Sequence, residues 1–173
     1  MSDSTPSVLL HLATSADGFI ARPSGDSSWV SQVDEGVFVE RVQDAGCVII
    51  GKRTFDQYHG IIYPVPKALN IVLTENKEFK FDDGNVAVAH SPEEALSLAK
   101  EKGFLRVVIA GGARTAAAFF KKGLIDEIFL SVHPIVLDSG LKALDDLSSD
   151  PRYKLEGERE LPEGVTELHY RMI

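Results

Sequence analysis

Short apolar runs alternate with helix-forming segments along most of this chain, and this alternation restricts the fold more than any other feature. Apolar runs of four to eight residues are typical of buried strands, and longer stretches with apolar residues on one face are typical of helices. Alternating strands and helices build a largely parallel sheet with helices on both faces. The expected strands are 8–14, 47–51, 67–74, 85–90, 105–110 and 124–136, and the expected helices are 34–45, 54–58, 92–103 and 113–122.

The clearest helix boundary is Ser91-Pro92-Glu93-Glu94. It combines an N-cap serine, a proline in the first helical position and a glutamate three residues after the cap. Gly103 is expected to end this helix, and Gly123 to end the one after it.

The C-terminal part of the chain predicts a hairpin. Residues 153–161 and 165–173 alternate in character and are separated by Pro162-Glu163-Gly164. The fold class is therefore α/β, with three α-β-α layers and a mixed, mostly parallel sheet that ends in an antiparallel hairpin. Ligands in such sheets bind beyond the carboxyl ends of the parallel strands. Those ends are followed by residues 14–29, 51–54, 74–77 and 111–115.

Length and composition predict one domain over residues 1–173, with residues 1–6 disordered. The net charge of −8 argues against nucleic acid or a membrane surface as a partner. The single cysteine, Cys47, lies in an apolar run, so we expect a buried thiol and no disulfide. No signal peptide or membrane-length apolar stretch is found, which favours a cytoplasmic protein.

Two strand-to-helix turns have the chemistry of phosphate binding. Gly111-Gly112-Ala113-Arg114-Thr115 offers close backbone approach and a helix start with free N–H groups. Gly51-Lys52-Arg53-Thr54 adds two cations and a hydroxyl. The alternative readings are an ordinary glycine turn and a solvated Lys-Arg pair. Because both turns follow parallel strands in an acidic chain, we expect them to face one dinucleotide.

A third group is Trp29, Asp34 and Phe38, at and just before a helix start. A carboxylate beside aromatic rings is suited to orient a nitrogen heterocycle and assist proton transfer. Ser31-x-x-Asp34 also fits a capping box, and the two aromatic residues also fit a core. The five histidines lack the spacing of a metal site, so no metal is expected.

These segments resemble the dihydrofolate reductase superfamily in their order and spacing. Residues 15–21 (Ser-Ala-Asp-Gly-Phe-Ile-Ala) are similar to the loop after the family's first strand. The stretch from Trp29 to Thr54 keeps the spacing of dihydrofolate reductase itself. Gly111-Gly112, followed by Leu124-Ile125-Asp126-Glu127 and a long strand, most resembles the reductase domain of the riboflavin-biosynthesis deaminase–reductase.

The resemblance implies a dihydrofolate reductase-like fold, an NADPH cofactor and a small-molecule substrate. The implied cofactor-binding residues are Ala13, Ile20, Gly51, Lys52, Arg53, Thr54, Thr74, Gly111, Gly112, Ala113, Arg114 and Thr115. The implied substrate-binding residues are Trp29, Asp34 and Phe38, with Asp34 as the catalytic residue that binds the ring and assists protonation. Resembling reductase domains commonly form dimers, so a homodimer is expected.

The resemblance leaves the choice between NADPH and NADH and the activity open. Glu75 and Asn76 follow Thr74 where the family often has Ser or Arg for the 2′-phosphate of NADPH, although Lys52, Arg53 or Lys77 could compensate. The expected reaction is hydride transfer to a C=N or C=O group of a pterin-, pyrimidine- or sugar-derived substrate. The alternatives are a non-catalytic nucleotide-binding module of the same fold and a flavin-binding protein.

Overall fold

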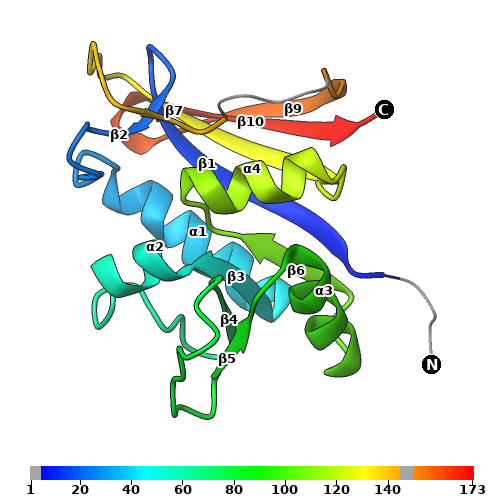
Figure 1. Ribbon diagram of the computed structural model, residues 1–173. Coiled ribbons are helices and arrows are strands. Elements are labelled where there is room, and N and C mark those ends of the chain that lie inside the picture. Colours follow the sequence, from blue (N-terminus) through cyan, green and yellow to red (C-terminus); the bar gives the residue numbers. More distant parts are fainter. Residues whose placement is uncertain (1–4, 145–149) are drawn as a thin grey trace.

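The computed structural model describes residues 5–144 and 150–173, which form an eight-stranded sheet with helices on both faces (Figure 1). The strands of this sheet are β1 (Ser7–Ser15), β3 (Cys47–Gly51), β4 (Leu69–Leu73), β5 (Val86–Ala89), β6 (Arg106–Ile109), β7 (Glu127–His133), β9 (Tyr153–Leu161) and β10 (Val165–Met172). The helices are α1 (Gln32–Ala45), α2 (Lys52–Gln57), α3 (Pro92–Glu101) and α4 (Ala113–Lys121), with a 3-10 turn at Pro162–Gly164. Two short strands, β2 (Phe19–Ala21) and β8 (Leu141–Lys142), pair separately.

The strand order is β5-β4-β3-β6-β1-β7-β10-β9. The strands from β5 to β7 are parallel to their neighbours, while β10 is antiparallel to both β7 and β9. This arrangement confirms the predicted fold class and the C-terminal hairpin. Strand β9 lies at the edge of the sheet and carries mostly exposed side chains. The expected homodimer stays a prediction.

The core has two layers because successive residues of a strand point to opposite faces of the sheet. Cys47 and Ile49 of β3 pack in a cluster with residues of α3 and α4. Val48 and Ile50 pack in a second cluster with Phe38 and other residues of α1 and α2. A near-continuous apolar strand is therefore covered by helices on both sides.

Helix α1 begins earlier than predicted because of its cap. The hydroxyl of Ser31 accepts a hydrogen bond from the N–H of Asp34, which places Gln32 as the first helical residue instead of Asp34. The helix ends at Gly46, whose φ of 79° lies in the left-handed region that suits glycine. The predicted start of α3 after Ser91 is confirmed, and α3 ends two residues before Gly103, at Glu101.

Several predicted boundaries were wrong by a few residues. The strand predicted over 124–136 spans only Glu127–His133, because the N–H of Leu124 bonds back to Phe119 at the end of α4 and Pro134 has no N–H to donate. The helix predicted over 54–58 begins at Lys52. The strands β2 and β8 were not predicted. Of residues 1–6, predicted to be disordered, residues 1–4 lie outside the described part.

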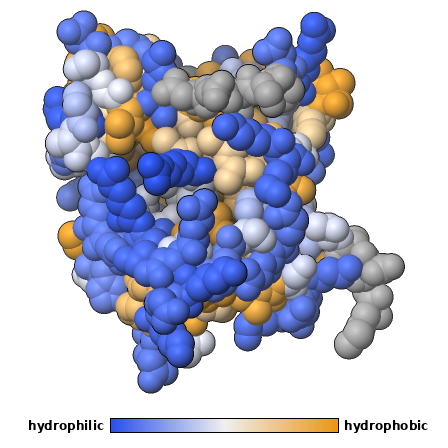
Figure 2. Space-filling model, viewed as in Figure 1, coloured by the Kyte–Doolittle hydropathy of each residue, from blue (hydrophilic) through white to orange (hydrophobic). Residues whose placement is uncertain are grey.

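None of the helices in the described ranges has the length and apolar character needed to cross a membrane. In the view of Figure 2, hydrophilic side chains predominate on the surface, with smaller apolar patches between them.

Candidate active site

A cleft of about 1150 Å³ opens at the carboxyl ends of the parallel strands. It is lined by residues that follow β1, β3, β4 and β6, as the topology of an open α/β sheet predicts. Its volume exceeds that of a typical small-molecule pocket, about 300–1,000 Å³. The cleft is therefore large enough for a dinucleotide together with a second molecule.

The two predicted turns meet in this cleft. The N–H of Gly112 donates to Thr54 Oγ1 at 3.1 Å, and the N–H of Gly51 donates to the carbonyl of Gly111 at 3.1 Å. The peptide bond between Gly111 and Gly112 is cis. A Cβ added at Gly51 would overlap Thr115 Oγ1, and one added at Gly112 would lie 3.1 Å from Thr54 Oγ1. The glycines are required because the two turns pack directly on each other.

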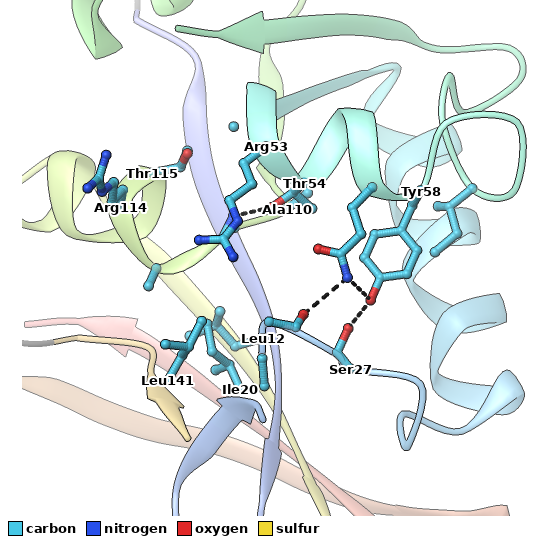
Figure 3. Close-up of a pocket in the computed structure, with 18 of the residues that line it drawn as sticks. Leu12, Ile20, Ser27, Arg53, Thr54, Tyr58, Ala110, Arg114, Thr115 and Leu141 are labelled. Carbon is cyan, nitrogen blue, oxygen red and sulfur yellow. Dashed lines mark hydrogen bonds between the residues drawn. The ribbon is translucent and has the colours of Figure 1, made fainter. Parts of the chain in front are cut away.

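The cations of the turns differ in their surroundings. Lys52 Nζ lies 2.5 Å from Asp56 Oδ2 and 4.8 Å from the centre of the Phe79 ring, so its charge is already compensated. Arg53 and Arg114 are exposed, and neither forms an ion pair or hydrogen bond within the described residues. In Figure 3 the Arg53 side chain extends from α2 into the space between Thr115 and Tyr58. These two guanidinium groups are therefore available to an anionic ligand.

Asp34 projects from the first turn of α1 and is almost fully buried, with 1% of its surface exposed. Its Oδ1 accepts a hydrogen bond of 2.5 Å from the hydroxyl of Ser131 on β7. The same oxygen lies 3.5 Å from Nε2 of His11 on β1. Phe38, one turn further along α1, packs at 5.3 Å from the His11 ring. Asp34 and Phe38 both line the cleft.

The carboxylate of Asp34 does not complete the capping box. In such a box, the third helical residue would accept from the backbone N–H of the cap residue. Here the N–H of Ser31 donates instead to Nε2 of His133, at 3.1 Å. Asp34 contributes only its backbone N–H to the cap, and its side chain is directed to Ser131 and His11.

The environment of Asp34 favours the ionised form. Burial raises the pKa of this carboxyl, but the interactions with His11 and His133 and the hydrogen bond from Ser131 together outweigh it. The net effect is a pKa below the ordinary value of 3.8. Asp34 is therefore a carboxylate at neutral pH, and in that state it accepts hydrogen bonds and carries no proton to donate.

Comparison with known proteins identifies the family. A sequence model of the RibD C-terminal domain matches residues 6–166 of the chain. The chain belongs to the RibD C-terminal domain family. The predicted resemblance is thereby confirmed.

The relatives of this RibD C-terminal domain cover nearly all of the chain. It is 28% identical to the uncharacterized protein YwjB of Bacillus subtilis over 94% of the chain and 95% of that protein. It is similar in fold to the Thermotoga maritima diaminohydroxyphosphoribosylaminopyrimidine deaminase/5-amino-6-(5-phosphoribosylamino)uracil reductase, with a TM-score of 0.76, 22% identity and coverage of 98% of this chain and 57% of the other. It is also similar to dihydrofolate reductase of Enterococcus faecalis complexed with NADP(H), with a TM-score of 0.75, 20% identity and coverage of 96% of each chain.

The cleft of this RibD C-terminal domain brings together most of the predicted site residues. Those that line it are Ala13, Ile20, Asp34, Phe38, Gly51, Lys52, Arg53, Thr54, Thr74, Gly111, Gly112, Ala113, Arg114 and Thr115. Trp29 is not among the lining residues. Its ring packs edge-on against His133 at 5.4 Å, and its Nε1 is buried without a hydrogen-bond partner within the described residues. The individual binding roles stay predictions.

Sequence reasoning missed two polar residues beside Asp34. His11 and Ser131 come from the neighbouring strands β1 and β7, and both are buried. The available signal was strand alternation: His11 lies two residues before Ala13, so both side chains point to the same face of the sheet. Within residues 5–144 and 150–173, no cluster of three or more His, Cys, Asp or Glu side chains is arranged to hold a metal ion.

Proposed function

We propose that this RibD C-terminal domain is an NADPH-dependent reductase that adds hydride to a C=N or C=O carbon of a small pterin-, pyrimidine- or sugar-derived substrate. The observation that carries the proposal is that both glycine turns and the Asp34 carboxylate line one cleft. Support also comes from the reductases with the same fold, one of which was solved with NADP(H).

The residues of the cleft fit a dinucleotide. Gly112 caps α4 without a side-chain hydrogen bond, so the first N–H groups of this nine-residue helix are left for an anion. The close packing at Gly51 and Gly112 leaves backbone, not side chains, at the surface of the cradle. Gly111–Thr115 and Thr54 would hold the pyrophosphate, and Ala13 and Ile20 would lie along the nicotinamide. Arg53 and Arg114 would meet the remaining phosphate charge.

The preference for NADPH over NADH depends on Arg53 and Arg114. Glu75 lines the cleft after β4, and a carboxylate there disfavours a 2′-phosphate. Lys52 is engaged by Asp56, which removes one of the cations expected to compensate. Arg53 and Arg114 have no carboxylate partner among residues 5–144 and 150–173, and their two charges outweigh that of one carboxylate.

When bound, a reduced nicotinamide supplies two electrons and one hydrogen as hydride. The substrate heteroatom takes up one proton, for which solvent water is the source, because Asp34 is ionised. Asp34 would accept a hydrogen bond from a substrate N–H and stabilise positive charge on the substrate nitrogen. A substrate imine next to this anion is therefore protonated more readily, and its carbon accepts hydride more readily.

The test is an NADPH oxidation assay with dihydrofolate and with aminouracil-type pyrimidines as substrates, using the wild-type chain and Asp34→Asn. The expected result is turnover with at least one of these compounds. Asp34→Asn should lower turnover about 10- to 100-fold, because it removes a hydrogen bond between the substrate and a charged group. The affinity for NADPH, measured by quenching of its fluorescence, should stay nearly unchanged.

Three results would contradict the proposal. Fluorescence quenching by bound NADPH without oxidation of any substrate would indicate a nucleotide-binding module. Turnover by Asp34→Asn at the wild-type rate would show that Asp34 makes structural contacts only and does not take part in the reaction. A yellow preparation would point to flavin in place of a nicotinamide.

A further inference from the structure

A line of five polar side chains runs from the cleft to the edge of the sheet. It begins at Asp34, passes through His11 and Arg41, and continues to Glu167 on β10 and Arg159 on β9. Asp34, His11 and Glu167 are buried, and only Arg159 is more than half exposed. Buried charges of this kind are retained only where each is paired.

Arg41 is fixed at the centre of this line. Its Nη2 donates to both carboxylate oxygens of Glu167, at 3.0 and 3.2 Å. Its guanidinium carbon lies 3.8 Å from the centre of the Phe129 ring. Arg159 Nε donates to the same Glu167 at 2.8 Å from the outer side. The Arg41 guanidinium is therefore held by contacts on its edge and on its face.

The position of Arg41 determines the proton on His11. Arg41 Nη1 lies 2.5 Å from His11 Nδ1. A guanidinium has only donors, so Nδ1 must be the acceptor and the ring proton must be on Nε2. Nε2 is the nitrogen that faces Asp34 Oδ1 at 3.5 Å. His11 thus directs its Nε2–H to the carboxylate.

In this arrangement the two carboxylate oxygens of Asp34 have different surroundings. Oδ1 receives the Ser131 hydroxyl and faces the His11 N–H. No hydrogen bond to Oδ2 is found in the described part of the chain, and Asp34 lines the cleft. One oxygen is therefore engaged by the protein, and the other is left for a ligand.

We infer that His11, locked by Arg41 as the Nε2–H tautomer, is a positioning residue that reserves Asp34 Oδ2 for a substrate with an N–H donor. The inference rests on the proposed function in one respect, namely that the cleft binds a heterocycle at Asp34. It adds the residues that orient Asp34: Arg41 sets the tautomer of His11, and the His11 N–H faces Oδ1, so that Oδ2 is left for the ligand.

The tautomer is tested first because it does not depend on activity. Long-range ¹H–¹⁵N spectra of histidine-labelled protein report which ring nitrogen of His11 is protonated. In the wild-type chain at neutral pH, Nδ1 should be unprotonated and Nε2 protonated. Arg41→Lys keeps a cationic donor and should keep this pattern, whereas Arg41→Met should lose it. A wild-type ring protonated on Nδ1, or an unchanged pattern in Arg41→Met, would overturn the inference.

Binding of a diaminopyrimidine tests the consequence for ligands. In its protonated form this probe offers a ring N–H and an amino group, which together match a carboxylate. His11→Leu and Arg41→Met should weaken its binding about tenfold, the effect of one lost hydrogen bond to a charged group. His11→Gln, which keeps a side-chain N–H donor, and Arg41→Lys should bind it nearly as the wild type does. The affinity for NADPH should be the same in all of these variants.

The comparison of the two ligands separates positioning from folding. A variant that is merely less well folded would lose affinity for NADPH and for the diaminopyrimidine together. Equal binding of the probe by His11→Leu and the wild type would overturn the positioning role. If the wild type bound NADPH but not the probe, the proposed binding of a heterocycle at Asp34 would be wrong, while the tautomer spectra would still decide whether Arg41 locks His11.

Discussion

Gly51 is the position at which the meeting of the two turns is tested most directly, by the substitution Gly51→Ala. Its backbone angles, φ −64° and ψ 140°, are allowed for any residue, so alanine introduces no backbone strain. The added methyl group would overlap Thr115 Oγ1 and lie 3.7 Å from the carbonyl of Gly111. Thr115 is buried and its side chain is short, so it cannot move aside freely. The effect of the substitution is therefore one of packing alone.

Overpacking of this kind costs about 1–3 kcal/mol of unfolding free energy. For a chain of this length, each kcal/mol corresponds to about 2–4 °C in melting temperature. Gly51→Ala should therefore lower the melting temperature by roughly 2–12 °C, and it should weaken NADPH binding because the cradle must open. Thermal unfolding followed by circular dichroism and fluorescence titration with NADPH measure the two effects.

A second substitution identifies the cause. Thr115→Ala removes the Oγ1 atom, so the double variant Gly51→Ala, Thr115→Ala should recover most of the lost stability, with a coupling energy of about 0.5–3 kcal/mol. The control is Gly36→Ala in the exposed middle of α1, where an added Cβ has no neighbour within 4 Å. This control should stabilise the chain by about 0.5–1 kcal/mol. Wild-type stability of Gly51→Ala, or no recovery in the double variant, would refute the packing of the two turns.

Two further predictions concern charge. Arg53→Gln and Arg114→Gln should each weaken NADPH binding about two- to fivefold, the value of an exposed ion pair. The effect on NADH binding should be smaller, and the effect on NADPH binding should become smaller as salt is added. The control Arg106→Gln, at the amino end of β6 and outside the cleft, should change neither affinity. Equal effects in all three variants would contradict the role of Arg53 and Arg114 in binding the cofactor phosphates. The second prediction concerns acid unfolding: burial raises the pKa of Asp34, the interactions with His11, Ser131 and His133 together lower it more, and the net pKa is below 3.8. Between the pKa of Asp34 in the folded chain and its pKa in the unfolded chain, the unfolded chain binds more protons. Asp34 therefore contributes stability above the unfolded pKa, and this stability is lost as the pH falls through the folded pKa. Asp34→Asn should therefore reduce the acid slope of unfolding free energy by at most about 1.4 kcal/mol per pH unit, and an unchanged slope in urea unfolding would show that the pKa of Asp34 is not lowered.

Strands whose ends are marked in the sequence were predicted well. Residues 47–51 match β3 at both ends because an apolar run is bounded by Gly46, which ends α1, and by the first residue of α2. The strands β2 and β8 could not be predicted in this way. They have three and two residues, too few to show a period, and they form through a tertiary contact in which Gly140 lies against the backbone of Ala21.

The candidate site was predictable where its residues are neighbours in sequence. Each glycine turn combines its special backbone and its polar groups within five residues, so the chemistry is visible locally. The contacts of Asp34 are different, because Ser131 lies 97 residues away along the chain and Arg41 meets Glu167 across 126 residues. Nothing in the local sequence distinguishes a capping Asp34 from one that is also bound across the sheet. In the structure Ser31 caps the helix by accepting from the N–H of Asp34, and the Asp34 side chain is bound across the sheet.

The arginines show why residue type alone does not identify a ligand site. Arg41 has 13% of its side chain exposed and is satisfied by Glu167 and His11 inside the protein, so its charge is used to hold the fold and the tautomer. Arg53 and Arg114 are exposed at the cleft and have no carboxylate partner in the described ranges. In a chain with 26 acidic and 18 basic residues, a cation without a partner is available to a ligand. The distinction depends on which groups the fold brings within reach of each guanidinium, and it is the reason that Arg53 and Arg114, rather than Arg41, are expected to determine the choice between NADPH and NADH.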